Sequence, residues 1–174
     1  MADNFKEKLN KIKAFAFDVD GVFTDGGVLL LPGNEFARTV NIKDGYAVQH
    51  CVKMGFPIAI ISGGKSESVR TRFKNLGVTD IYLGSSYKWE DYEDFRMKYS
   101  FEHEEILYMG DDIPDYEVMQ NVGIPACPAD AAHEIKEISL YVSTFGGGSG
   151  CVRDVIEQVL RLNEKWMNKD ALKW

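Results

Sequence analysis

The sequence predicts a single α/β domain over residues 1–174, with a mostly parallel sheet and helices on both of its faces. Short apolar runs alternate with segments of helical periodicity along the chain, which is typical of strand–helix–strand units. Polar residues stand directly after several of these runs, where parallel sheets bind their ligands. A chain of 174 residues with 45% hydrophobic residues is also large enough to bury one sizeable core.

The first half of the chain predicts a lead-in helix, a central strand and a hairpin. A helical face over residues 5–12 precedes the apolar run 14–18. Two apolar runs, 28–31 and 36–41, flank a Pro-Gly-Asn turn and predict a β-hairpin over about 26–41. The next predicted elements are a helix that Asp44 caps and Gly55 ends, a strand over 57–61, a helix over 66–76 and a strand over 80–83.

The second half continues the alternation of strand and helix. Its predicted elements are a helix over 89–99, a strand over 106–109, a helix over 114–121, a strand over 124–127, a helix over 132–138, a strand over 140–142 and a helix over 152–160. The tail, about 164–174, carries Trp166 and Trp174 and has no clear period. It is either a disordered end or a segment whose tryptophans pack over a neighbouring subunit's site.

Composition argues against several classes of function. The formal net charge is −7 with acids and bases mixed, so we expect no nucleic acid and no membrane as a partner. No apolar run approaches membrane-spanning length, and the charged segment 1–13 lacks the apolar centre of a secretory signal. Cys51, Cys127 and Cys151 lie far apart, without the paired spacing of metal ligands. We therefore expect free thiols and a cytoplasmic protein.

Five aspartates form the central chemical pattern. Asp18 and Asp20 follow the first strand, while Asp111 and Asp112 follow a later one, with Asp115 a helical turn further on. Parallel strands that end at one edge would bring these carboxylates together, and magnesium prefers such oxygen ligands. For single residues the structural alternatives are helix capping by Asp111 or Asp112 and turn formation by Asp20. For the whole set we predict a magnesium site.

The same edge suits phosphoryl transfer. Asp18 ends its strand directly and is the better nucleophile toward phosphorus, while Asp20 can act as general acid and then as base. Ser62, at the start of a glycine-rich turn, and Lys88 can donate to the phosphoryl oxygens. Taken alone, Ser62 is equally compatible with an ordinary helix cap and Lys88 with a solvated surface lysine.

Four segments resemble the ordered motifs of the haloacid dehalogenase-like phosphohydrolases. They are Asp18-Val19-Asp20-Gly21-Val22 for motif I, Ile60-Ile61-Ser62-Gly63 for motif II, Lys88 for motif III and Gly110-Asp111-Asp112-Ile113-Pro114-Asp115 for motif IV. The resemblance implies a Rossmann-like fold that uses magnesium. Members with a separate cap domain insert it between motifs I and II or III and IV. Here the first interval holds only a hairpin and one helix, and the second holds one helix. The resemblance therefore implies a capless member.

The resemblance also implies a role for each motif residue. Asp18 would be the nucleophile and a metal ligand, and Asp20 the general acid and base, touching the substrate and lending its main-chain carbonyl to the metal. Ser62 and Lys88 would hold the phosphoryl group, with the Gly63 amide beside them. Asp111 would be a further magnesium ligand. The residues implied to support these ligands from behind are Asp112 and Asp115.

Further segments narrow the resemblance to the 3-deoxy-D-manno-octulosonate 8-phosphate phosphatases. These segments are Asn41-Ile42-Lys43-Asp44-Gly45-Tyr46, Arg72 ahead of Leu76-Gly77, Leu83-Gly84, and Gly147-Gly148 with Gly150 and Arg153. The resemblance implies a homotetramer whose hairpins meet at its centre and whose neighbouring subunits help close each site. It also implies contacts with the sugar acid from residues 41–45 and Arg72, whose guanidinium suits a carboxylate. The family acts in lipopolysaccharide precursor biosynthesis.

Three positions depart from that family's pattern. Ser149 stands where a basic residue is usual, Gly64 replaces a basic residue with Lys65 next to it to compensate, and Gln49 replaces an arginine of some relatives. A related nine-carbon 2-keto-3-deoxy sugar acid 9-phosphate is therefore the alternative substrate.

Two alternatives belong to other classes of function. A receiver-like phospho-switch domain also combines aspartyl phosphate, magnesium, a hydroxyl and a lysine. In a receiver, however, the acidic pair comes first, whereas here Asp111 and Asp112 follow Lys88. A catalytically retired scaffold is the second alternative, and the presence of every motif residue argues against it.

Overall fold

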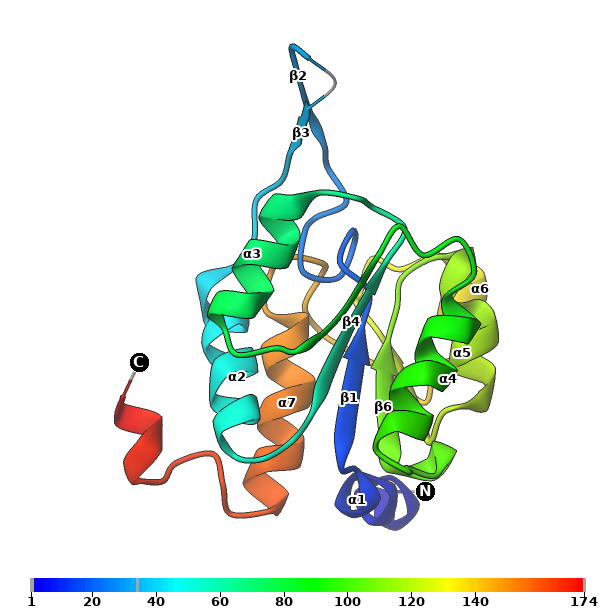
Figure 1. The fold of residues 1–174 in the computed structure, drawn as a ribbon. Coiled ribbons are helices and arrows are strands. Elements are labelled where there is room, and N and C mark those ends of the chain that lie inside the picture. The colour runs from blue at the N-terminus through cyan, green and yellow to red at the C-terminus, as the bar shows by residue number, and fades with distance from the viewer. Residues whose placement is uncertain (1, 34, 174) are drawn as a thin grey trace.

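A computed structural model describes residues 2–33 and 35–173 and shows a six-stranded parallel sheet between two layers of helices (Figure 1). The strands are β1 (Ala14–Phe17), β4 (Ile58–Ser62), β5 (Asp80–Leu83), β6 (Ile106–Met109), β7 (Ile124–Cys127) and β8 (Tyr141–Val142). Their order in the sheet is β5-β4-β1-β6-β7-β8, so β1 pairs with both β4 and β6. The carboxyl ends of these three strands therefore meet at the middle of one edge.

The helices cover the sheet as the alternating pattern predicts. They are α1 (Ala2–Lys11), α2 (Ile42–Lys53), α3 (Glu67–Asn75), α4 (Lys88–Lys98), α5 (Tyr116–Asn121), α6 (His133–Ile138) and α7 (Cys151–Leu162), with the 3-10 turns η1 (His103–Glu105), η2 (Ile113–Asp115) and η3 (Lys169–Leu172). Within the described ranges, no helix is long and apolar enough to cross a bilayer.

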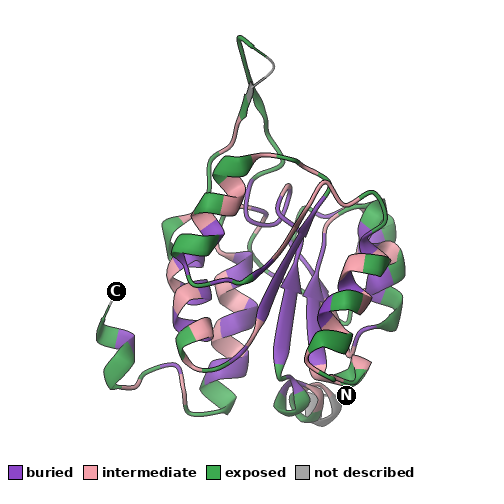
Figure 2. Cartoon of the chain, viewed as in Figure 1, coloured by how far each residue is buried: buried purple, intermediate pink, exposed green. Residues whose placement is uncertain are grey.

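The two faces of β1 pack into separate apolar layers. Phe15 and Phe17 point into the layer formed with α1, α2, α3 and α7, while Ala14 and Ala16 face α4, α5 and α6. All four residues are fully buried, which explains why the strand is apolar throughout rather than alternating. Figure 2 shows the same contrast over the molecule, with buried central strands between helices that are exposed on their outer sides.

The hairpin is an exposed antiparallel pair, β2 (Leu29–Leu31) with β3 (Glu35–Ala37), that projects beyond the site end of the sheet (Figure 1). Its turn residue Asn34 lies outside the described residues. The predicted second run, 36–41, is too long, because pairing stops at Ala37. The residues that follow leave the ladder for other partners, since Arg38 reaches Asp20 and Asn41 caps α2.

The prediction that Asp44 caps α2 is wrong. The helix begins earlier, at Ile42, and the Asn41 carboxamide oxygen accepts from the Lys43 N–H at 2.8 Å. Asp44 lies inside the first turn and accepts instead from the Arg153 N–H at 2.8 Å, in the first turn of α7. Its side chain therefore joins the two helices that form one flank of the fold.

The tail packs on α2 in the same chain. Tyr46 donates its hydroxyl to the Ala171 carbonyl at 2.6 Å, and a His50 ring nitrogen lies 2.8 Å from the Lys165 carbonyl. Trp166 is 4% exposed and meets the rings of both residues edge-on. Disorder is thus wrong for the tail up to residue 173. The other tryptophan, Trp174, lies outside the described residues, and a contact with a neighbouring site stays a prediction.

Candidate active site

The segments after β1, β4, β5 and β6 bring the predicted residues into one cavity. Asp18, Asp20, Ser62, Lys88 and Asp111 all line a hollow of about 510 Å³ at the carboxyl ends of these strands. Figure 1 shows this end of the sheet beneath the hairpin. The convergence that the sequence predicts is therefore present in the fold.

A buried ion network stands at the base of the cavity. The Lys88 ammonium lies 2.7 Å from Asp18 Oδ2 and 2.7 Å from Asp115 Oδ1. Tyr108 donates its hydroxyl to the same Asp115 oxygen at 2.6 Å. With Lys88 only 6% exposed, its interpretation as a surface lysine is wrong. We call Asp18, Lys88, Asp111 and Asp115 the acidic edge.

Burial and mutual charge interactions shift the pKa values of Asp18, Lys88 and Asp111. Burial and the charge of Asp115 raise the pKa of Asp18 to about 7, against the opposing attraction of Lys88. Burial and Asp115 likewise raise the pKa of Asp111 to about 7. Burial alone would lower the pKa of Lys88, but Asp115 and Asp18 outweigh it and the pKa is raised. A positive ion beside Asp18 and Asp111 would therefore stabilise their ionised forms, which Lys88 stabilises only in part.

The donor set fits magnesium. One carboxylate oxygen each from Asp18, Asp111 and Asp115 lies within 4.8 Å of the other two. Asp115 is already occupied, because Oδ1 accepts from Lys88 and Tyr108 while Oδ2 accepts from the N–H groups of Asp111 and Asp112 at 3.1 and 3.4 Å. Asp18 and Asp111 are thus the side chains that would hold the ion, and Asp115 hydrogen-bonds to the residues around them.

Gly21 lets the loop after β1 approach Asp111. Its φ is +82°, and the Asp111 carboxylate occupies the place that a Cβ would take. The backbone next to Asp20 therefore lies close to the Asp111 carboxylate. The role of the Asp20 carbonyl as a metal ligand stays a prediction. The Asp112 side chain, in contrast, is exposed and caps η2 by accepting from the Ile113 N–H at 2.9 Å. The capping alternative is correct for Asp112.

Ser62 lines the cavity at the end of β4. It is 3% exposed, and its hydroxyl oxygen accepts from the Gly64 N–H at 3.1 Å. The helix-cap interpretation of Ser62 is wrong, because α3 begins later and its N-cap residue is Ser66. The hydroxyl proton of Ser62 remains available to a bound anion.

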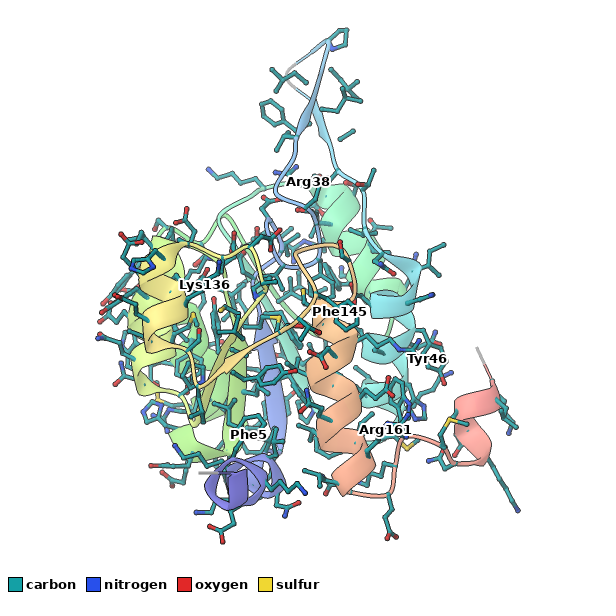
Figure 3. The ribbon with its side chains drawn as sticks, turned by 180° about the vertical axis from the view of Figure 1, so that it is seen from behind. Phe5, Arg38, Tyr46, Lys136, Phe145 and Arg161 are labelled. Carbon is teal, nitrogen blue, oxygen red and sulfur yellow. The ribbon has the colours of Figure 1, made fainter. Side chains whose placement is uncertain are left out.

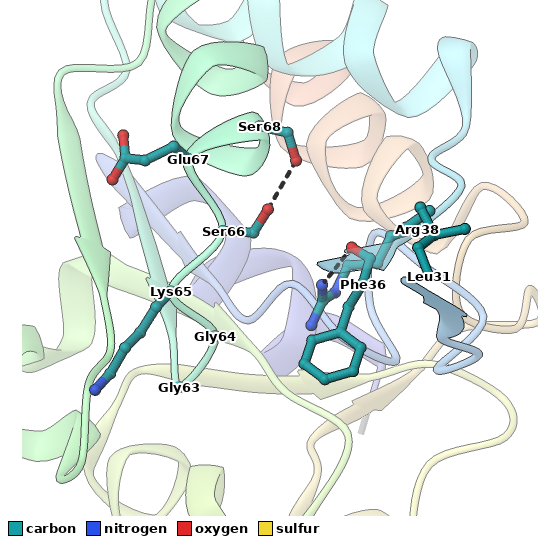
Figure 4. Close-up of a pocket in the computed structure, with 10 residues that line it drawn as sticks. Leu31, Phe36, Arg38, Gly63, Gly64, Lys65, Ser66, Glu67 and Ser68 are labelled. Carbon is teal, nitrogen blue, oxygen red and sulfur yellow. Dashed lines mark hydrogen bonds between the residues drawn. The ribbon is translucent and has the colours of Figure 1, made fainter. Parts of the chain in front are cut away.

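A second hollow of about 800 Å³ continues from Gly63 and Gly64 toward the hairpin. Figure 4 shows Phe36 and Arg38 on its hairpin side and the turn into α3 opposite them. Lys65 extends away from Arg38 in this view, and its stem lies against Gly84. The predicted substrate contacts of Gly63 and Lys65 stay predictions.

Arg38 is a site residue that the sequence patterns did not reveal. Its Nε donates to Asp20 Oδ1 at 2.5 Å and its Nη2 to Asp20 Oδ2 at 3.1 Å. The partner is 18 positions away, so no local motif links the two residues. Tyr108 was missed as well, although a tyrosine within a buried apolar run signals that its hydroxyl has a partner.

The residues implied to touch the sugar acid have varied surroundings. Ile42 and Lys43 are exposed, and the Arg72 guanidinium lies against Gly45. Besides its cap, Asn41 donates to the Gly148 carbonyl at 3.2 Å. The Asp44 side chain is 0% exposed and therefore cannot make the predicted contact in this conformation. The contacts of the other residues stay predictions.

The glycine-rich loop before α7 braces the loop after β1. The Gly148 N–H donates to the Val22 carbonyl at 2.9 Å, and Gly147 lies so close to the Gly21 carbonyl that no Cβ would fit. This packing gives the glycines a structural role within the chain.

No family model matches the chain, but individual proteins resemble it over most of its length. It is 34% identical over 153 residues to the 3-deoxy-D-manno-octulosonate 8-phosphate phosphatase KdsC of Escherichia coli K12, covering 88% of this chain and 81% of that protein. The chain belongs to the 3-deoxy-D-manno-octulosonate 8-phosphate phosphatase family. The predicted family is thereby confirmed, and the receiver-like alternative is set aside.

Solved structures of this phosphatase family agree with the fold. The enzyme of Yersinia pestis matches with a TM-score of 0.91 and 31% identity, over 94% of this chain and 88% of that one. The enzyme of Moraxella catarrhalis, solved with magnesium, phosphate and the octulosonate, matches with a TM-score of 0.89 and 30% identity over 93% of each chain. The predicted α/β fold class is confirmed, and the bound ion of that relative agrees with the donor set described above.

Proposed function

We propose that this chain is a magnesium-dependent phosphatase that hydrolyses 3-deoxy-D-manno-octulosonate 8-phosphate to the free acid and phosphate. The observation that carries the proposal is the buried Asp18 carboxylate, fixed by Lys88 and adjoining Asp111, with Asp20 at the mouth of the same cavity. A nucleophile, a proton carrier and a cation site are the groups that hydrolysis through an aspartyl phosphate requires.

In the first step an oxygen of Asp18 attacks phosphorus. The bond from phosphorus to the sugar oxygen breaks, its electron pair stays on that oxygen, and a proton from the Asp20 carboxylic acid neutralises it. Ser62 and Lys88 hold the phosphoryl oxygens during the transfer. Magnesium held by Asp18 and Asp111 would offset the negative charge that two carboxylates and a phosphate bring together.

In the second step water attacks the same phosphorus atom. Asp20, now a carboxylate, takes a proton from this water, and the bond between phosphorus and Asp18 breaks. The electron pair of that bond returns to Asp18, which restores both aspartates after inorganic phosphate has left. Asp115 takes no part in bond making and keeps Lys88 in place.

The proposal for the substrate is supported by the relatives that share the whole fold. The nine-carbon sugar acid 9-phosphate is the second candidate, and it is favoured by Gly64, Gln49 and Ser149, which depart from the family pattern. None of these three residues belongs to the acidic edge. The identity of the sugar acid is therefore a separate question from the reaction.

Phosphate release with magnesium tests the proposal. A purified preparation should be given the eight-carbon and nine-carbon acids and unrelated sugar phosphates. We expect the eight-carbon substrate to have the highest kcat/KM and activity to disappear with a chelator. Preference for the nine-carbon acid would overturn the substrate, and absence of hydrolysis from every acidic sugar phosphate would overturn the phosphatase itself.

We further propose a cytoplasmic homotetramer that acts in lipopolysaccharide precursor biosynthesis. Exposed apolar side chains on both hairpin strands support assembly, with Leu29 64%, Leu30 72% and Phe36 51% exposed. The three cysteines are free thiols, which suits a reducing compartment. Neighbouring subunits would then cover a site that has no cap domain.

A further inference from the structure

Arg38 stands between the hairpin and the active site. It follows β3 directly, yet its side chain is only 14% exposed, in contrast to the apolar residues of the hairpin before it. Figure 3 shows it at the base of the hairpin, where the projecting strands return to the domain. A charged side chain that is partly buried is stabilised by a partner, and the partner here is Asp20.

The guanidinium holds both oxygens of Asp20. Nε and Nη2 donate to the two carboxylate oxygens at 2.5 and 3.1 Å, which is the bidentate geometry that fixes the plane of a carboxyl group. The remaining nitrogen, Nη1, donates to the Phe36 carbonyl at 3.4 Å, so the hairpin backbone orients the guanidinium in turn (Figure 4). Each of the three nitrogens therefore makes a hydrogen bond within the chain, and two of these bonds go to Asp20.

Asp20 is held by fewer different groups than Asp18, so the Arg38 contact matters more for its orientation. The Asp18 side chain is 11% exposed and is held by Lys88 and the Val19 N–H, whereas the Asp20 side chain is 35% exposed. The residue after Asp20 is a glycine in a left-handed conformation, which adds no side-chain packing. Among the described residues, the side-chain hydrogen bonds to the Asp20 carboxylate come from Arg38.

The pair also faces the phosphoryl-binding turn. A Cβ placed on Gly64 would lie 3.6 Å from Asp20 Oδ2, 3.6 Å from Arg38 Nη2 and 3.3 Å from Ser62 Oγ. Asp20, held by Arg38, thus lies next to the position where a phosphate ester would bind.

We propose that Arg38 is a positioning residue that aims the carboxyl group of Asp20 at the leaving-group oxygen of the substrate. The proposal rests on the phosphatase activity proposed above. Without the guanidinium, Asp20 would remain in the cavity but rotate among orientations that do not reach this oxygen. The chemistry of Asp18 and the binding of magnesium would be unaffected.

Leaving groups of different basicity test this role. An alkyl phosphate, such as a sugar phosphate, needs a proton on its departing oxygen, whereas p-nitrophenyl phosphate releases a stable anion and needs little help. The variants are Arg38→Met, which keeps the stem and removes every donor, and Arg38→Lys, which keeps the charge but not the bidentate geometry. Arg161→Met is the matched control, since that exposed arginine of α7 pairs with Glu157 far from the site (Figure 3).

We expect Arg38→Met to lower kcat for the sugar-acid phosphate by about 100-fold and for p-nitrophenyl phosphate by less than about threefold, with KM unchanged for both. Arg38→Lys should recover part of the alkyl activity, and Arg161→Met should match the wild type. Equal losses with the two esters would overturn the proposal in favour of a general structural role. A rise in KM confined to the sugar acid would overturn it in favour of direct substrate binding.

The two proposals can fail separately. If the wild type hydrolyses p-nitrophenyl phosphate but no sugar-acid phosphate, the proposed substrate falls. Another alkyl ester, glycerol phosphate or glucose 6-phosphate, then supplies the alkyl arm of the same comparison. If no ester of either kind is hydrolysed, both proposals fall.

Discussion

The acidic edge and the hairpin are built in opposite ways. The acidic edge puts charged groups in the interior, where Asp115 is 0% and Lys88 6% exposed, and satisfies them with one another. The hairpin puts apolar groups in solvent, where Leu30 is 72% exposed, and satisfies them with nothing in this chain that the structure describes. Each arrangement is unfavourable alone, and each therefore indicates a partner.

The partners differ in kind. The acidic edge needs a cation and a phosphate, and all four of its side chains come from one chain. The hairpin needs other protein surface, and the family resemblance implies that other copies of the chain supply it. Arg38 joins the two regions, because it leaves β3 and ends on Asp20. Substitutions in the acidic edge should therefore affect the reaction, and substitutions in the hairpin should affect assembly.

The largest effect is expected for Asp18→Asn. An amide cannot attack phosphorus, so the rate of phosphate release should fall by roughly 10⁴-fold or more. Thermal unfolding should show that the fold is kept, because the substitution removes a carboxylate whose pKa burial and Asp115 raise. Retention of substantial activity would show that the nucleophile lies elsewhere.

We expect Leu30→Asp to affect catalysis less than Asp18→Asn does, but to have a large effect on assembly. A charge on the exposed strand should disrupt packing between hairpins, and light scattering should show the mass falling from that of four chains toward one. The free energy of unfolding of the chain itself should change by less than about 0.5 kcal/mol, since the residue contributes nothing to the core. An unchanged mass would remove the hairpin from the interface.

A pH-dependent effect on stability is expected from the acidic edge. Burial and Asp115 raise the pKa of Asp18 and of Asp111 from an ordinary 3.8 to about 7, so between these values the folded protein binds more protons than the unfolded chain. Without metal, the free energy of unfolding should therefore fall as the pH rises from about 4 to about 7. Magnesium should reverse the trend, because it binds the carboxylates.

Melting temperatures with a chelator and with magnesium at several pH values measure this trend. Asp18→Asn should flatten the slope seen with the chelator, and Leu30→Asp should leave it unchanged. A slope that is the same in Asp18→Asn as in the wild type would place its origin outside the acidic edge.

The smallest effect is expected for Tyr108→Phe. The substitution removes one of the two donors to Asp115 Oδ1, which should cost about 1–2 kcal/mol of stability and lower the activity less than about tenfold. Tyr82→Phe is the control, because that hydroxyl makes a 2.7 Å bond to Asp94 away from the site. If the two variants had equal activity, Tyr108 would have no part in orienting the acidic edge.

The sequence predicted most of what the sheet determines. The strands of the six-stranded sheet were predicted from their short apolar runs, and the acids after β1 and β6 converge because parallel strands share one edge. Asp18 and Asp111 could be named from sequence since their position at a strand end determines where they point. The buried state of Lys88 could not, because the sequence next to a lysine does not reveal what covers it.

The misses share a physical cause, which is dependence on distant partners. Asn41 and Asp44 are both good helix caps, and only the packing of α7 against α2 assigns Asp44 to Arg153. Arg38 acts through a residue 18 positions away, and the tail is ordered by Tyr46 and His50 of α2. Local propensity contains no information on such contacts.

The most direct test of the account is to trap the phosphorylated chain. The protein would be mixed with magnesium and substrate, quenched in acid within the first turnovers, and its peptides mapped by mass spectrometry. The account predicts a phosphoryl group on Asp18 that appears during turnover and disappears once the substrate is consumed. A phosphoryl group on another residue, one that persists after the substrate is gone, or turnover without any phosphorylated peptide would contradict it.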